Sequence, residues 1–231
     1  MNEKLISATD CQVLVEKLTS LVDEVVFDNG KNTLYFYKDT QKCVQMRLPI
    51  FWNSPEKMSL NQLEETNYIL LIIRSGIAAV GYFENGENID HKVFRAYMVR
   101  KKQGKSQIKH LKTKGKSRAG SRVRLAETLA FFEAINSRLR HYFEEFRVDK
   151  IGVSYATTLV PYVFGSKVAP PFTKEDPRIF KIPKHIANPT FESLLETNLF
   201  MLKATVKYED HMAAVIVSNQ DTTTDDDLED W

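Results

Sequence analysis

The sequence YILLIIRSGIAAVGYF, from Tyr68 to Phe83, sets the fold class of this chain. Its first part, Tyr68–Arg74, is an apolar run that ends in one arginine, which is typical of a strand buried on both faces. Ser75 and Gly76 then turn the chain, and a second apolar run follows over Ile77–Phe83. The pattern predicts two neighbouring strands at the centre of a sheet.

The residues that follow predict a third strand, a long helix and a returning strand. Residues 93–100 alternate between apolar and polar side chains, as a strand does. Residues 122–147 carry apolar side chains at helical spacing, namely Leu125, Leu129, Phe132, Leu139 and Phe143. Residues 151–156 then return as a strand. This order predicts an α/β fold in which a mixed, mostly antiparallel sheet is flanked by helices.

The flanking regions are expected to complete or extend this sheet. Their clearest patterns are a helix over residues 10–26, strands over 34–37 and 43–52, and a helix over 191–201. Six prolines between Pro161 and Pro189 predict an irregular connection, and residues 203–217 fit either a strand or a helix.

Four regions are therefore expected along the chain. They are an N-terminal helix and strands that extend the core (1–60), a central domain (61–160) with a basic loop at 101–122, a proline-rich connection with C-terminal elements (161–218), and an acidic tail (219–231) that is expected to be disordered.

The formal net charge of +2 conceals an uneven distribution of charge. Between His91 and Ala126 there are 13 Lys or Arg and no Asp or Glu, whereas the rest of the chain has 19 basic and 30 acidic residues. A cationic segment within anionic sequence favours a polyanion that binds at one place. Nucleic acid is the partner that this pattern indicates; a solvated basic loop and an acidic protein partner are the alternatives.

Several other functions lack the residues that they need. The five histidines and two cysteines have no spacing typical of a zinc site, so no metal and no cofactor is expected. Gly104-Lys105-Ser106 is similar to the end of a phosphate-binding loop, but Val99 stands where the first glycine of that loop would be. The sequence has no apolar run of membrane-spanning length and no secretory signal, and the cysteines fit free thiols in a reducing cytosol. A cytoplasmic protein is expected.

Residues 99–107, at the end of a predicted strand, have the sequence VRKKQGKSQ. This stretch resembles the catalytic loop of the Vms-type release-factor-like family, whose pattern is VRxKQGGSQ and whose eukaryotic members free stalled nascent chains from large ribosomal subunits. The similarity covers roughly residues 65–156 and continues downstream at Lys116, Ser117, Ser121, Arg124 and Glu127. The resemblance implies a domain like the catalytic middle domain of eukaryotic and archaeal class I release factors.

The resemblance also implies a catalytic loop in which Gln107 is the working residue, with Gly104 and Ser106 beside it. Glutamine does not titrate, so its amide is suited to positioning a water or a ribose hydroxyl rather than to acting as a general base. Gly104 would let the backbone approach the terminal adenosine of tRNA. Two reactions are then open: hydrolysis of the peptidyl ester, or cleavage of the tRNA just before its CCA end.

The surrounding cations are expected to hold phosphates of the acceptor stem and of ribosomal RNA. These residues are Arg100, Lys101, Lys102, Lys105, Lys109, Lys112, Lys114, Lys116, Arg118, Arg122 and Arg124. The expected partners are the large ribosomal subunit and peptidyl-tRNA, with no membrane and no metal ion.

One residue departs from the family pattern, because Lys105 stands where the family has its second glycine. Lysine restricts the backbone and adds bulk and charge at the point of closest approach, so a non-catalytic ribosome- or RNA-binding factor is the alternative function. Arg124 and Glu127 could form an ion pair along a helix instead of contacting phosphate. A further hypothesis is that the acidic tail mimics RNA and binds the basic loop.

Overall fold

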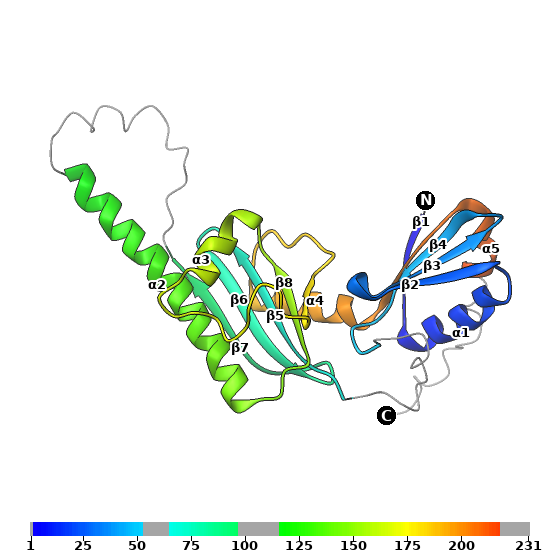
Figure 1. Ribbon diagram of the computed structural model, residues 1–231, viewed down its shortest axis with the longest axis horizontal. Helices are drawn as coiled ribbons and strands as arrows, with labels where there is room; N and C mark the ends of the chain where they lie inside the picture. Colours follow the sequence, from blue (N-terminus) through cyan, green and yellow to red (C-terminus); the bar gives the residue numbers. More distant parts are fainter. Residues whose placement is uncertain (1, 53–64, 97–115, 218–231) are drawn as a thin grey trace, which may run out of the picture. The chain divides into compact units, whose positions relative to one another are not determined.

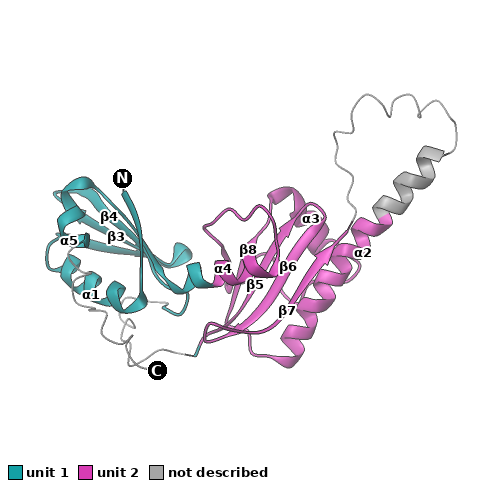
Figure 2. Ribbon diagram, turned by 180° about the vertical axis from the view of Figure 1, so that it is seen from behind, with its two compact units in different colours: residues 1–65, 199–231 teal, residues 66–198 magenta. Residues whose placement is uncertain are grey.

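The computed structural model describes residues 2–52, 65–96 and 116–217, and it divides the chain into two compact units (Figure 1). Unit 1 comprises residues 1–65 and 199–231, and unit 2 comprises residues 66–198 (Figure 2). Each unit has a five-stranded sheet and a hydrophobic core of its own. The α/β fold class predicted from the sequence is confirmed.

The sheet of unit 2 is mixed and has the strand order β7-β6-β5-β8-β9. Its strands are β5 (Asn67–Arg74), β6 (Ile77–Glu84), β7 (Glu87–Arg95), β8 (Lys150–Ser154) and β9 (Ile179–Lys181). The first three form an antiparallel meander, whereas β8 pairs parallel to β5 and β9 parallel to β8.

Helices lie on both faces of this sheet. They are α2 (Lys116–Glu145), α3 (Val160–Phe164), which follows a 3₁₀ turn at Thr157–Leu159, and α4 (Phe191–Leu202). The face with Ile69 and Val80 packs against α2. On the other face, a Cβ atom on Gly81 would lie 2.6 Å from a methyl group of Leu194 in α4, so glycine allows the close approach of this helix. The six residues from Tyr68 to Ile73 are buried, as the apolar run of β5 predicts.

The sheet of unit 1 is antiparallel throughout, with the order β1-β10-β4-β3-β2. The strands are β1 (Asn2–Ile6), β2 (Glu24–Asp28), β3 (Thr33–Lys38), β4 (Gln41–Arg47) and β10 (Ala204–Tyr208); the helical elements are α1 (Ala8–Thr19), α5 (Ala213–Val217) and 3₁₀ turns at Asn29–Lys31 and Asp210–Met212. Buried side chains of α1, including Leu14 and Leu18, join Leu34 and Phe36 of the sheet in one core.

Several predicted boundaries differ from the structure. The helix expected over residues 10–26 ends at Thr19, because the hydroxyls of Thr19 and Ser20 donate to carbonyl groups of the last turn, and β2 follows. The strand expected over 43–52 ends at Arg47, and the strand expected to begin at residue 93 begins at Glu87. The N-terminal strands form a second sheet with β10 instead of extending the central one.

Candidate functional site

The predicted catalytic loop lies outside the described residues. This applies to Gln107, Gly104 and Ser106, and to the basic residues Arg100, Lys101, Lys102, Lys105, Lys109, Lys112 and Lys114. Lys116, Arg118, Arg122 and Arg124 lie in the first part of α2, where the structure describes the backbone alone. The structure describes the two elements that flank this segment in the sequence, namely the end of β7 and the start of α2.

Helix α2 begins at Lys116 and not near Arg122, where the sequence pattern places the start of the helix. The stretch Lys116–Arg122 contains one glycine and otherwise mostly residues that a helix accepts readily, so its lack of apolar side chains does not prevent helix formation. Two of the predicted RNA-binding residues, Lys116 and Arg118, are thereby placed along a helix rather than in a loop.

The end of the sheet from which the loop departs is tightly organised. Arg95, the last residue of β7, is in register with Ile77 of β6, and Ile77 is in register with Arg74 at the end of β5. The amide of Ala96 donates to the carbonyl of Gly76 at 2.9 Å. Gly76 has a φ of 78°, a conformation that glycine adopts without strain in the two-residue turn between β5 and β6.

Arg74 joins the ends of two strands at this place. Its Nη1 donates to the carbonyls of Ile73 and Ser154, both at 2.8 Å, and its Nη2 donates to Ser154 Oγ at 3.1 Å. The buried Nε has no hydrogen-bond partner among the described residues. Burial lowers the pKa of this guanidinium. Arg74 is therefore a fixed cation whose charge no hydrogen-bonded carboxylate of the described residues balances.

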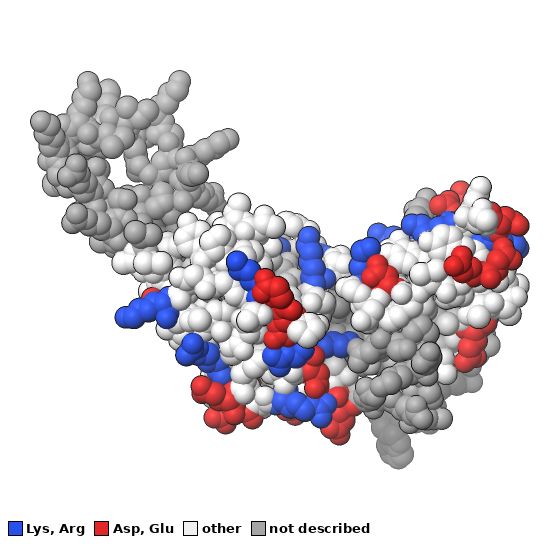
Figure 3. Space-filling view, viewed as in Figure 1, with Lys and Arg blue, Asp and Glu red and all other residues white. Residues whose placement is uncertain are grey.

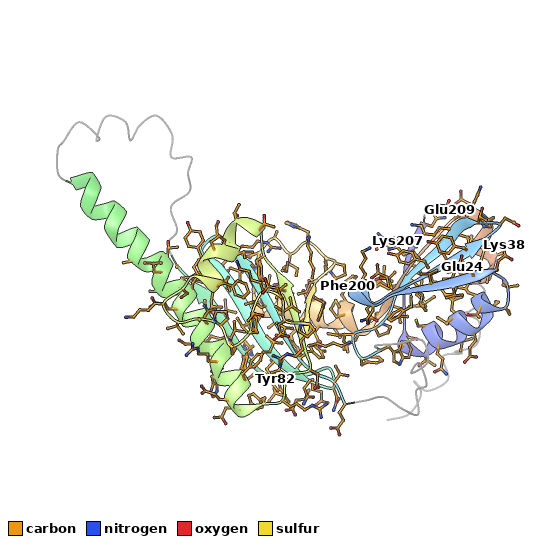
Figure 4. The ribbon with its side chains drawn as sticks, viewed as in Figure 1. Glu24, Lys38, Tyr82, Phe200, Lys207 and Glu209 are labelled. Atoms are coloured by element: carbon orange, nitrogen blue, oxygen red, sulfur yellow. The ribbon has the colours of Figure 1, made fainter. Side chains whose placement is uncertain are left out.

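Helix α2 is held on the sheet below the loop by polar and aromatic contacts. Arg138 of α2 forms an ion pair with Asp90 of β7. Nearer the end of α2, the ring of Tyr82 stacks on Phe146 with 4.3 Å between the centroids, and its hydroxyl donates to the carbonyl of Arg147 (Figure 4). These contacts attach the C-terminal half of α2 and the residues after it to β6 and β7.

Charge is divided between the units. Unit 2, residues 66–198, has 23 Lys or Arg and 12 Asp or Glu, a net charge of +11, whereas unit 1 has 9 basic and 18 acidic residues, a net charge of −9. Residues 91–126 supply this excess of positive charge, because the rest of unit 2 has 10 basic and 12 acidic residues.

Charge is also graded along unit 2. Glu84 and Glu87 flank the β6–β7 turn and Asp149 precedes β8, which places these acids at the end of the sheet opposite to the loop. Figure 3 shows acidic and basic side chains together at the lower end of unit 2, where α2 finishes. At the loop end, the strand ends carry Arg74 and Arg95.

The described residues offer no alternative site based on a metal. Within them, no three His, Cys, Asp or Glu side chains are grouped so that they could hold a metal ion. None of the described helices combines the length and apolar character that crossing a membrane requires. Cys11 and Cys43 are buried, free thiols.

Sequence reasoning did not single out Arg74 or Arg95 as functional residues. Arg74 reads locally as the end of an apolar strand, and Arg95 as one polar position of an alternating strand. Their proximity follows from the register of three strands, which no local pattern contains. The signal that could have indicated them is the lack of any acidic residue from Thr66 to Phe83 and from His91 to Ala126.

Comparison with known proteins identifies the class of this chain. The model of a family described as "Bacteroidetes VLRF1 release factor" matches residues 68–209, which is more than half of the chain and includes the loop, α2 and the sheet of unit 2. The chain belongs to this family and is a release-factor-like protein, for which interaction with the ribosome is implied.

Two further comparisons complete this result. The solved structure of the "Vms1 mitochondrial localization core" is similar to this chain with a TM-score of 0.43 and 15% sequence identity, covering 90% of this chain and 91% of that one. No curated protein sequence matches the chain.

Proposed function

We propose that this protein acts on peptidyl-tRNA of stalled large ribosomal subunits, with Gln107 positioning the nucleophile. The observation that carries the proposal is the sequence VRKKQGKSQ within the region that the release-factor family matches. The loop that contains it is bounded by β7 and α2 of a unit with a net charge of +11. A cationic unit supports binding of an RNA substrate, and the sequence of the loop supports chemistry at the tRNA end.

The proposed chemistry depends on position rather than on proton transfer by a side chain. The Gln107 amide can donate two hydrogen bonds and accept others, so it can orient a water molecule towards the ester carbonyl or a ribose hydroxyl towards the phosphodiester. In the first case the peptide is released from intact tRNA. In the second case the tRNA is cut before its CCA end and the peptide leaves with the terminal nucleotides.

The test is a release assay with stalled large subunits that carry peptidyl-tRNA labelled in both the peptide and the tRNA. We expect wild type to release the peptide and Gln107→Ala to lose at least about a hundredfold of the rate, as enzymes do when a positioning group is removed. The length of the tRNA product identifies the bond that is cut. Gln41→Ala, a change of an exposed glutamine in unit 1, is the control and should keep the wild-type rate. Equal release by wild type and Gln107→Ala would overturn the proposed role.

A second function is favoured by one residue. Lys105 replaces a glycine of the Vms-type pattern, and a protein with a bulky, charged residue there could bind the ribosome without cutting. In that case neither wild type nor Gln107→Ala releases peptide although both sediment with large subunits, and Lys105→Gly gains release. Binding that withstands RNase would instead indicate an acidic protein partner.

A further inference from the structure

Arg74 and Arg95 form a pair of cations on one face of the sheet, at the end from which the loop departs. Both residues are in register with Ile77, Arg74 across the β5–β6 pair and Arg95 across the β6–β7 pair. Residues directly opposite each other in antiparallel strands project from the same face, so the three Cβ atoms lie in one row, from which the Arg74 guanidinium extends to Ser154 at the end of β8. Since neighbouring strands are about 4.8 Å apart, the two arginine Cα atoms are separated by roughly 10 Å.

Among the described residues, no acid forms an ion pair with Arg74 or Arg95. Arg74 donates to two carbonyls and one hydroxyl, and none of its hydrogen-bond partners among the described residues is a carboxylate. Arg95 is exposed. From Ile151, within β8, to Lys174 the sequence contains no Asp or Glu, and neither does the segment from Pro177 to Phe191, the first residue of α4.

A partly buried guanidinium without a counter-charge is costly in the free protein, and an anion that binds there offsets the cost. The carbonyl and hydroxyl acceptors fix the orientation of the Arg74 side chain, whereas Arg95 is exposed and free to adapt. This combination of one rigid and one adaptable cation suits phosphate groups of a nucleic-acid backbone.

We propose that Arg74 and Arg95 bind backbone phosphates of the tRNA acceptor end, at the end of the sheet where β5 and β7 finish. The inference rests on the proposed function and adds to the predicted RNA-binding residues two that lie in the strands of the sheet. Both arginines are positioning residues, because they hold the RNA at a distance from the reacting bond.

The test measures binding of a labelled tRNA acceptor-stem minihelix, with a single-stranded CCA end, at a series of salt concentrations. Each phosphate contact contributes about 0.9 to the slope of log affinity against log salt. We therefore expect Arg74→Gln and Arg95→Gln each to reduce the slope by about one. Compared with wild type, each variant should lose roughly eightfold more affinity at 0.1 M salt than at 1 M salt. The double variant should lose about two from the slope.

Lys92→Gln is the matched control, because Lys92 is an exposed cation of the same strand that is in register with Val80 and projects from the opposite face. It should keep the wild-type slope. Arg74→Lys separates the effect of the charge from the effect of the hydrogen bonds. It keeps the positive charge but loses the forked hydrogen bonds of the guanidinium. It should therefore retain most of the salt slope of binding even if its melting temperature falls. Arg95 is exposed, so we expect Arg95→Gln to keep the fold and to test the pair independently of the stability of Arg74 variants.

Three results would count against these conclusions in different ways. An unchanged slope in Arg74→Gln and Arg95→Gln, with salt-dependent binding by wild type, overturns the phosphate-binding pair and leaves the proposed function intact. A loss in Lys92→Gln as large as that in Arg95→Gln overturns the assignment to one face of the sheet. Wild type that does not bind the minihelix at all overturns both the pair and the proposed action on tRNA.

Discussion

Arg47 is a buried cation of unit 1 and has a structural role. Its guanidinium donates to the carbonyls of Leu48, Phe200 and Lys203 and to the hydroxyl of Thr205, and it lies over the ring of Phe200, 4.6 Å from the centroid (Figure 4). Two of these carbonyls belong to the C-terminal end of α4 and the residue that follows it, where a helix leaves acceptors unsatisfied. Burial lowers the pKa of Arg47 to about 10.

We expect Arg47→Met to lower the free energy of unfolding by about 3 kcal/mol, because several buried acceptors lose their donor at once. Urea denaturation followed by circular dichroism measures this change. Lys207→Met is the control: Lys207 forms an exposed ion pair with Glu3 on the same sheet, and pairs of this kind contribute less than about 1 kcal/mol. Equal effects of the two substitutions would show that Arg47 does not hold the end of α4.

Tyr82 makes the stability of unit 2 depend on alkaline pH. Burial and the nearby carboxylate of Glu84 raise the pKa of its phenol to about 12, whereas a tyrosine in the unfolded chain titrates near pH 10. The folded state therefore holds this proton more tightly. Its contribution to stability is complete below about pH 10 and is lost as the pH rises towards 12.

Tyr82→Phe should reduce this alkaline loss of stability, and it should also cost about 1 kcal/mol at pH 7 because the hydrogen bond to the carbonyl of Arg147 is removed. Thermal melts between pH 7 and 12 test both effects. Tyr162→Phe, a change at an exposed tyrosine of α3, serves as the comparison and should follow the wild-type profile. An unaltered profile in Tyr82→Phe would mean that other groups cause the alkaline transition.

At the level of elements, α2 and the segment around α3 are joined through one buried amide. Asn136 of α2 is fully buried, and its Nδ2 donates to the carbonyls of Val163 at 2.7 Å and Val168 at 2.8 Å. These two bonds attach a proline-rich stretch that has few regular backbone hydrogen bonds of its own. In the sequence, Asn136 occupies a position of the apolar stripe of the helix.

Asn136→Leu should keep the apolar packing but leave two carbonyls without a donor, at a cost of about 2–4 kcal/mol. Hydrogen exchange measured by mass spectrometry should show that the variant exchanges faster than wild type in residues 160–168. In the centre of β5 the increase over wild type should be smaller. Ser137→Ala, at the exposed neighbouring position, should change neither quantity. Faster exchange spread evenly over unit 2 would contradict a local role for this amide.

Elements were predictable where a local pattern is sufficient. The apolar runs of β5 and β6 identify buried central strands, and the spacing in α2 identifies its long helix. β2 was missed because Leu21 and Val25 continue the helical spacing of α1, and its pairing with β3 is what makes it a strand. The place of β10 depends on pairing with residues such as Arg47, 158 positions away from Thr205, which no local pattern records.

The same distinction applies to the candidate site. The motif around Gln107 is contiguous in sequence, so it could be recognised without the fold. The pair Arg74 and Arg95 exists only through the register of β5, β6 and β7, and Lys116 was assigned to a loop because its surroundings lack apolar side chains. Positions defined by strand pairing thus required the structure.

For the whole molecule, the opposite charges of the two units restrict where RNA can bind. Unit 1, with a net charge of −9, repels a polyanion, and the last eleven residues supply six of its 18 acids. These residues, 221–231, lie outside the described part of the chain. Acids on the same chain as the cationic unit compete electrostatically with weakly bound RNA. Salt screens this competition.

Replacing the six acids of the tail with Asn and Gln should therefore raise the affinity for the tRNA minihelix by a few-fold at low salt, and the difference should vanish towards 1 M salt. The chain length stays constant in this variant, so a loss of excluded volume cannot explain the gain. A scrambled tail that keeps all six acids is the control and should bind as wild type does, because the charge rather than the order of residues acts. If the neutral tail leaves both affinity and salt slope unchanged, the tail neither mimics RNA nor shields the loop, and the basic unit binds independently of the acidic one.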